Sequence, residues 1–111
     1  MVPCLIDLPY FDVKITVLKK TQTNEIFDEY ADPKFKPICN VVQEGIDYIS
    51  RREMMPEGFC PWAWADIQRD VVHLALGGEV PWSKQKHISI VSCTDGLRPV
   101  IFKLERLDTF M

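Results

Sequence analysis

Apolar and polar residues alternate along several stretches of the chain, which is the period of a strand with one buried face. The alternation along residues 11–17 predicts a first strand, and that along 45–50 predicts a second. A Thr-Asp-Gly turn at 94–96 lies between two further alternating runs, and Asp-Gly is a strong hairpin signal. We therefore expect residues 87–93 to pair antiparallel with residues 98–106.

Two segments have helical rather than strand character. Residues 23–31 carry a capping residue and acidic residues in the first turn, which predicts a short helix. Residues 61–76 begin with proline and stop at a Gly-Gly pair, and their apolar positions recur with the helical period. The side chains expected to be buried on this longer helix are Ala63, Trp64, Ile67, Val71 and Leu74.

An amphipathic helix must pack against another apolar surface, and the C-terminal hairpin offers one. We expect Ile88 and Ile90 to form that surface together with Val100, Phe102 and Leu104. The order strand, short helix, strand, long helix, hairpin predicts an α+β fold. Its core would be a small, mainly antiparallel sheet or a half-open barrel, with the C-terminal hairpin covered by the one amphipathic helix.

Length and charge limit the organisation and the partners of the protein. A chain of 111 residues is the size of one domain, so we expect residues 1–10 to be an irregular leader and residues 11–111 a single α+β domain. The formal charge of −3 comes without a basic face, so we expect no nucleic-acid partner. No signal peptide and no membrane-spanning apolar run are visible, which predicts a cytoplasmic protein that does not bind membranes.

The four cysteines are then expected to be free thiols, because disulfides are rare in the cytoplasm. Cys60 immediately precedes the proline that starts the long helix, so it lies at the helix N-terminus. Free N–H groups and the positive end of the helix dipole stabilise a thiolate there, which makes the sulfur nucleophilic. The alternative is that Cys60 is a small buried apolar residue that only packs.

Cys39 and Cys93 are the expected companions of Cys60, because both lie at the ends of predicted elements. Three thiols with His87 or His73 would supply the four ligands of a zinc site, although no CxxC pair is present. A redox pair of two thiols is a further alternative. The sequence leaves open whether any cofactor is bound.

Other polar and aromatic residues complete the candidate site. If the protein is an enzyme, Cys60 would be the nucleophile, His87 or His73 its proton partner, and Asp66 the orienting carboxylate. We expect Trp62 to form one wall of a ligand pocket. Arg98 leaves the hairpin turn and can bind an anionic group.

Three stretches carry a resemblance to known proteins: VKITVLKK (13–20), EGFCPWAWADI (57–67) and CTDGLRPVIFKLER (93–106). They resemble a family of small, uncharacterised bacterial and archaeal proteins of about this length. The resemblance implies a shared fold and a shared site at Cys39, Cys60 and Cys93, and it implies no reaction. The stretch around Gly45 departs from the family pattern by an extra Ile46, and residues 1–10, including Cys4, are additional to it.

These observations predict a small protein with a cysteine-centred pocket, acting as a minor enzyme or as a binder of a small-molecule ligand. One alternative is a protein that binds a metal through its thiols for structure or sensing. Another is a protein-interaction module without catalysis, in which the cysteines pack and Trp62 marks the partner surface. The sequence leaves the oligomeric state open.

Overall fold

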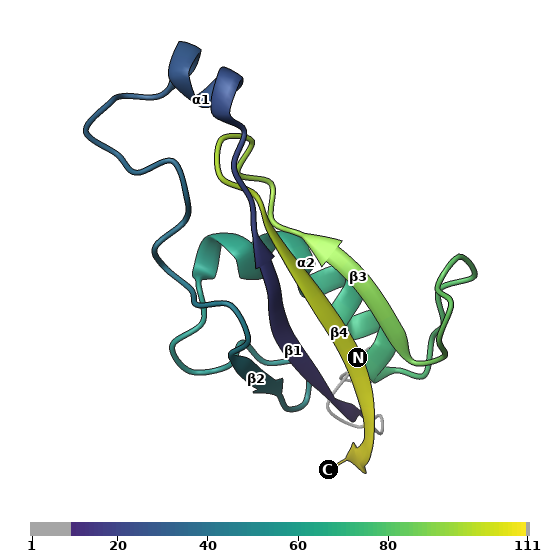
Figure 1. Ribbon diagram of the computed structural model, residues 1–111. Coiled ribbons are helices and arrows are strands. Elements are labelled where there is room, and N and C mark those ends of the chain that lie inside the picture. Colours follow the sequence, from purple (N-terminus) through teal and green to yellow (C-terminus); the bar gives the residue numbers. More distant parts are fainter. Residues whose placement is uncertain (1–9, 111) are drawn as a thin grey trace, which may run out of the picture.

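The computed structural model describes residues 10–110, which form an α+β fold around one sheet (Figure 1). The strands are β1 (Phe11–Lys20), β2 (Asp47–Ser50), β3 (Ile88–Ser92) and β4 (Val100–Phe110). All neighbouring strands are antiparallel, and their order across the sheet is β2-β1-β4-β3. The sheet has free edges at β2 and β3, so it is not closed.

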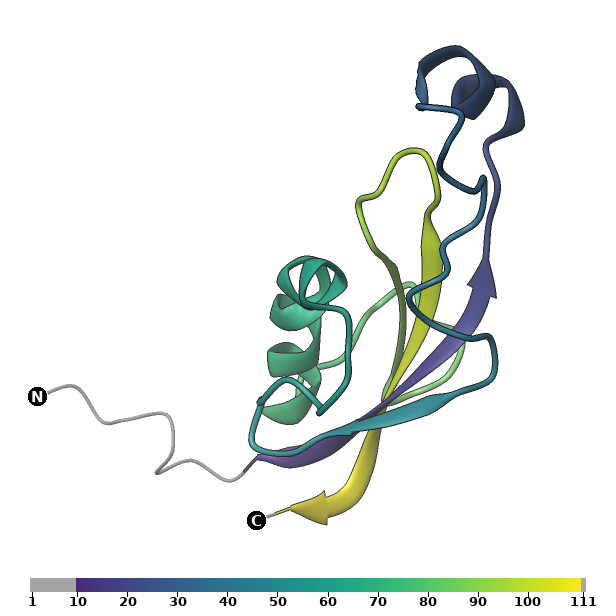
Figure 2. The ribbon, with the colours of Figure 1, turned by 90° about the vertical axis from the view of Figure 1, so that its left-hand side faces the viewer.

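The helices are α1 (Asn24–Tyr30) and α2 (Pro61–Ala75). Figure 2 shows α2 lying against one face of the sheet, whereas α1 lies beyond the end of the sheet. The sheet and α2 bury a common apolar core, because every second residue of the central strands points toward the helix. Its fully buried side chains include Val13, Ile15, Val17, Ile67, Val71, Leu74, Phe102 and Leu104.

The predicted long helix is confirmed, with Cys60 as its N-cap and Pro61 as its first residue. Four of its five expected core residues are buried, and Trp64 is the exception. Trp64 is half-buried and packs edge-to-face against Phe59, with ring centroids 6.2 Å apart. This ring packs at the margin of the core, in the first turn of α2.

The predicted hairpin is also confirmed, but the expected buried face of its first strand is wrong. Ser89 is buried and lies opposite Leu104, whereas Ile90 is 55% exposed and lies opposite Lys103. Every residue of one strand shares a face with its direct partner, so the buried Leu104 brings Ser89 to the helix side and leaves Ile90 on the open face. The stretch ISIVS has apolar residues on both faces, which is why its pattern alone misassigned them.

The expected leader falls mostly outside the described residues. Residues 1–9, including Cys4, are not described, and Tyr10, the last residue of the expected leader, is buried. Within residues 10–110, no helix is long and apolar enough to cross a membrane.

Candidate functional site

A pocket of about 550 Å³ opens where three distant segments meet. Its walls come from residues 39–42, from the first turn of α2 and from the hairpin loop between β3 and β4. In Figure 1 the chain between α1 and β2 returns past the N-terminal end of α2, which brings the first of these segments to the site. The lining includes Cys39, Val41, Val42, Cys60, Trp62, Ala63, Cys93, Leu97, Arg98, Val100 and Phe102.

All three described cysteines line this one pocket, although they are far apart in the chain. Each is half-buried and none is in a disulfide. The sulfur of Cys39 accepts a hydrogen bond from the backbone N–H of Val41 (3.5 Å), and that of Cys93 accepts one from Val100 (3.3 Å). The three thiols therefore share the lining of one pocket, and the common site predicted for them stays a prediction.

Cys60 enters the pocket as the N-cap of α2. Its backbone is extended, with φ −69° and ψ 117°, and its carbonyl accepts the hydrogen bond from the N–H of Trp64 (2.9 Å). Its side chain makes no capping bond to the helix. The sulfur therefore stays a free thiol at the start of the helix, in the lining of the pocket.

Trp62 and Arg98 both border the pocket. Trp62 is 68% exposed, so its ring borders the pocket and solvent at once. Nε of Arg98 donates to Oδ2 of Asp95 (3.2 Å), while Oδ1 of Asp95 accepts from the backbone N–H groups of Leu97 (3.0 Å) and Arg98 (3.2 Å). These bonds hold the loop in shape, and within residues 10–110 they leave the two terminal nitrogens of Arg98 without a hydrogen-bond partner.

Asp66 is one turn further along α2, but its carboxylate is occupied by the hairpin. Its two oxygens accept from the backbone N–H and from the hydroxyl of Thr94, both at 2.8 Å. Asp66 therefore fastens the hairpin wall of the pocket to α2. It is not placed as the orienting carboxylate of a cysteine–histidine pair.

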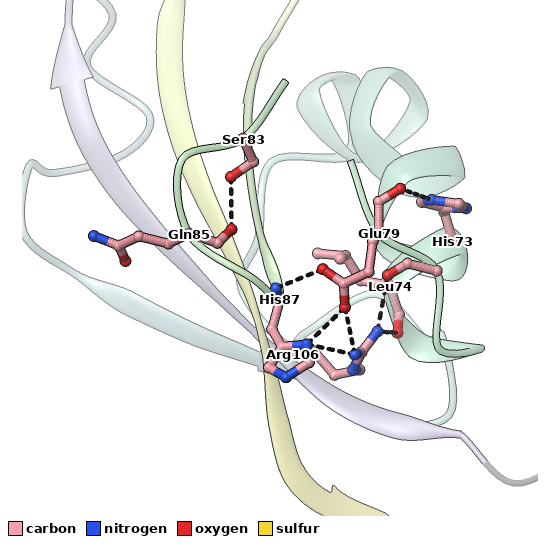
Figure 3. Close-up of polar contacts among 8 residues, drawn as sticks. His73, Leu74, Glu79, Ser83, Gln85, His87 and Arg106 are labelled. Carbon is pink, nitrogen blue, oxygen red and sulfur yellow. Dashed lines mark hydrogen bonds and ion pairs between the residues drawn. The ribbon is translucent and has the colours of Figure 1, made fainter. Parts of the chain in front are cut away.

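The two histidines lie at the opposite end of α2 from Cys60, in a polar cluster around Glu79 (Figure 3). Nδ1 of His87 is 2.7 Å from Oε2 of Glu79, and Nε2 of His73 is 3.0 Å from the Glu79 carbonyl oxygen. A helix of 15 residues is about 22 Å long, so neither ring reaches the thiol. The structure does not bring His87 or His73 to Cys60 as a proton partner.

Sequence reasoning did not identify Glu79 and Arg106 as members of this cluster. The Arg106 guanidinium donates to Oε2 of Glu79 (2.6 Å) and to the carbonyl oxygens of Leu74 (3.3 Å) and Gly78 (2.8 Å), and it also contacts the His87 ring. The Leu74 carbonyl also accepts from the backbone N–H of Gly77 (3.0 Å), so Arg106 ties β4 both to the last turn of α2 and to the loop after it. No local pattern signals the cluster, because β4, α2 and the loop after α2 each contribute part of it.

Glu79 is the strongly perturbed acid of this cluster. The backbone N–H of His87, which donates to Oε1 (2.8 Å), is the main cause that lowers the pKa of Glu79 from 4.5 to about 2. The side chains of His87 and Arg106 lower it further by hydrogen bonding and charge. All of these partners belong to the same polar cluster, and the cluster holds the loop after α2 against β4.

Within residues 10–110, no group of three or more His, Cys, Asp or Glu side chains is placed to hold a metal ion. The three thiols therefore share a pocket without forming a metal-ligand set in this structure.

In comparisons with known proteins, the chain matches no family model, no curated sequence and no solved structure. The resemblance drawn from the three motifs stays a prediction, and the function is argued from the pocket itself.

Proposed function

We propose that the protein binds a small, mostly apolar molecule in the cysteine pocket, with Cys60 as the reactive group of the site. The observation that carries this proposal is the shared lining: three free thiols, an exposed tryptophan and an arginine border one cavity of about 550 Å³. Ligand pockets usually measure about 300–1,000 Å³ and combine apolar walls with a few polar groups. The cysteine pocket has this composition.

Arg98 determines the polar part of the ligand. The walls contributed by Val42, Leu97 and Phe102 are apolar, and Arg98 is the one cationic side chain of the lining. Its Nε is engaged with Asp95, and its terminal nitrogens form the fork that suits a carboxylate or another planar anion. The ligand class that fits is an apolar molecule with one anionic group.

Binding is favoured over catalysis because the expected catalytic partners lie elsewhere. His73 and His87 belong to the cluster at the far end of α2, and Asp66 is bonded to Thr94. Cys60 remains in the pocket lining as a free thiol at the N-cap of α2, where an electrophilic ligand can reach it.

The fluorescent dye anilinonaphthalene sulfonate tests the proposal, because it combines an apolar ring system with an anionic group. Arg98→Gln should weaken dye binding about tenfold, which corresponds to about 1.4 kcal/mol and to the loss of a charge-assisted hydrogen bond. Arg69→Gln is the matched control, since Arg69 is an 89% exposed arginine on α2 outside this pocket. Equal dye binding by the two variants and the unmodified protein would disprove the assignment of the pocket.

A metal ion held by the thiols is the second candidate: Cys39, Cys60 and Cys93 line one pocket, although they do not form a metal-ligand set among the described residues. Zinc would then co-purify with the protein, and replacing any one of the three cysteines with serine would lower the zinc content. A metal-free protein that still binds the dye at Arg98 supports the ligand proposal alone.

A further inference from the structure

β3 is an edge strand whose outer backbone groups are unpaired within residues 10–110. The N–H of Cys93 donates to the carbonyl of Val100 (3.1 Å), and the N–H of Arg106 donates to the carbonyl of His87 (2.8 Å). In an antiparallel pair, alternate residues bond to the partner strand, so the residues between these direct their N–H and C=O groups outward. Ile88, Ile90 and Ser92 therefore offer hydrogen bonds at the free edge, on the outer side of β3 in Figure 1.

The residues of β3 itself give this edge little protection against strand addition, and the loop from Val80 to Gln85 lies beside it. The sequence of β3, ISIVS, contains no charged residue and no proline. Proteins normally protect an edge with lysine, proline, a bulge or a very short strand. The other edge, β2, has only four residues and begins with the charged Asp47. β3 is the edge that favours the addition of a strand.

The edge is flanked by a hollow on each side. One hollow of about 380 Å³ lies on the open face of the sheet, and another of about 590 Å³ lies between α2 and β3. Ile90 and Trp82 border both hollows, and Trp82 is 86% exposed. Side chains of an added strand point alternately to the two faces, so successive residues would enter the two hollows in turn.

The two hollows carry opposite charge. The open-face hollow is bordered by Lys84 and Lys103, which form no ion pair within residues 10–110, and no acidic residue lines it. The hollow beside α2 is bordered by Asp66, Asp70 and Glu79, of which Asp70 pairs with Arg69 at 3.9 Å and Glu79 pairs with Arg106, so Asp66 is the acid without an ion pair within residues 10–110. A complementary strand would therefore direct basic side chains toward α2 and acidic or large apolar side chains toward the open face.

We propose that the β3 edge binds an extended segment of another protein, which adds to the sheet as a further strand. The segment alternates basic residues with acidic or large apolar ones, and Trp82 packs against it as an aromatic anchor. The β3 strand of a second copy of this chain carries no charged side chain and would complement neither hollow, so the occupant is a different protein.

A short synthetic peptide that alternates lysine with isoleucine and glutamate is the probe, and a peptide of the same composition with its lysines grouped together is the control. The alternating peptide should bind at least about tenfold more tightly than the grouped one. Ile90→Pro should abolish this preference, because proline removes an outward N–H and leaves the bonds between β3 and β4 intact. Ile90→Thr keeps that N–H and should retain the preference.

Amide hydrogen exchange identifies the place of binding. On addition of the alternating peptide, the amides of Ile88, Ile90 and Ser92 should become protected, while that of Cys93, already bonded to β4, should change little. An unchanged melting temperature shows that Ile90→Pro still folds. Equal binding of both peptides, binding that survives Ile90→Pro, or self-association through β3 in place of peptide binding would each overturn the proposal.

Discussion

The two ends of α2 carry the two groups of polar and reactive side chains, and they differ in how completely their polar atoms are bonded. At the C-terminal end, Glu79 and Arg106 bond to each other, and each bonds in addition to neighbouring backbone groups. At the N-terminal end, Cys60 makes no capping bond and Trp62 is largely exposed beside a pocket.

This difference distinguishes a structural cluster from a binding site. A polar group with all its bonds made inside the protein has little left to offer a ligand, and its removal mainly costs stability. The pocket end has a thiol, a tryptophan ring and a guanidinium with unused bonding capacity around an apolar hollow. Replacing these groups should change the free energy of unfolding little, but it should weaken ligand binding. Mutations at the two ends should therefore affect different measurements.

The largest expected effect belongs to the core that both ends share. Ile67 is fully buried at the centre of α2, between the two clusters. Ile67→Ala should lower the free energy of unfolding by about 2–5 kcal/mol, because it removes buried methylene groups and leaves a cavity. Urea unfolding followed by circular dichroism measures the change. A loss below about 1 kcal/mol would show that α2 is not packed as described.

The comparison of the two ends is sharpest in a pair of arginine variants. Arg106→Gln should lower the free energy of unfolding by about 1.5–3 kcal/mol, since it removes the charged donor to Leu74, Gly78 and Glu79. Arg98→Gln should cost less than about 1 kcal/mol, because its ion pair is local and partly exposed. If urea unfolding gave equal losses of unfolding free energy for the two variants, the proposed difference between a structural cluster at one end of α2 and a binding site at the other would be wrong.

The pH dependence of stability tests the Glu79 cluster. The pKa of Glu79 is lowered from 4.5 to about 2 in the folded protein, so its contribution is complete above about pH 4.5 and is lost as the pH falls toward 2. Unfolding free energies of the native protein and of Glu79→Gln should therefore converge across this range. A difference between them that does not change with pH would show that the carboxylate is not held in its charged form.

The last and smallest expected effect is a difference in chemical reactivity between Cys60 and Cys4. Iodoacetamide should label Cys60 several-fold faster than Cys4 in the native protein at neutral pH, because helix N-termini are among the environments in which thiols are most reactive. Mass spectrometry after digestion measures the labelling rate of each cysteine. Cys4 lies outside the described residues and serves as the chemical reference. Labelling of Cys60 only after unfolding would make it a core residue.

Features that depend on neighbouring residues were predictable from the sequence. The period of α2, its proline start and its glycine stop identified the helix, and the same signals placed Cys60 at its N-cap. The Asp-Gly turn identified the pairing of β3 with β4. Each of these features arises from sterics and hydrogen bonds within a few residues, so the local sequence contains the necessary information.

Which distant residues meet was decided by the tertiary structure alone. The pairing of β1 with β4 and the packing of α2 across them bring Cys39, Cys60 and Cys93 to one pocket, and they carry His87 to Glu79 at the other end of the helix. Cooperative packing of the whole core selects these contacts, and every side chain of a strand changes face if its register shifts by one residue. Ser89 faces the helix in place of Ile90 for that reason.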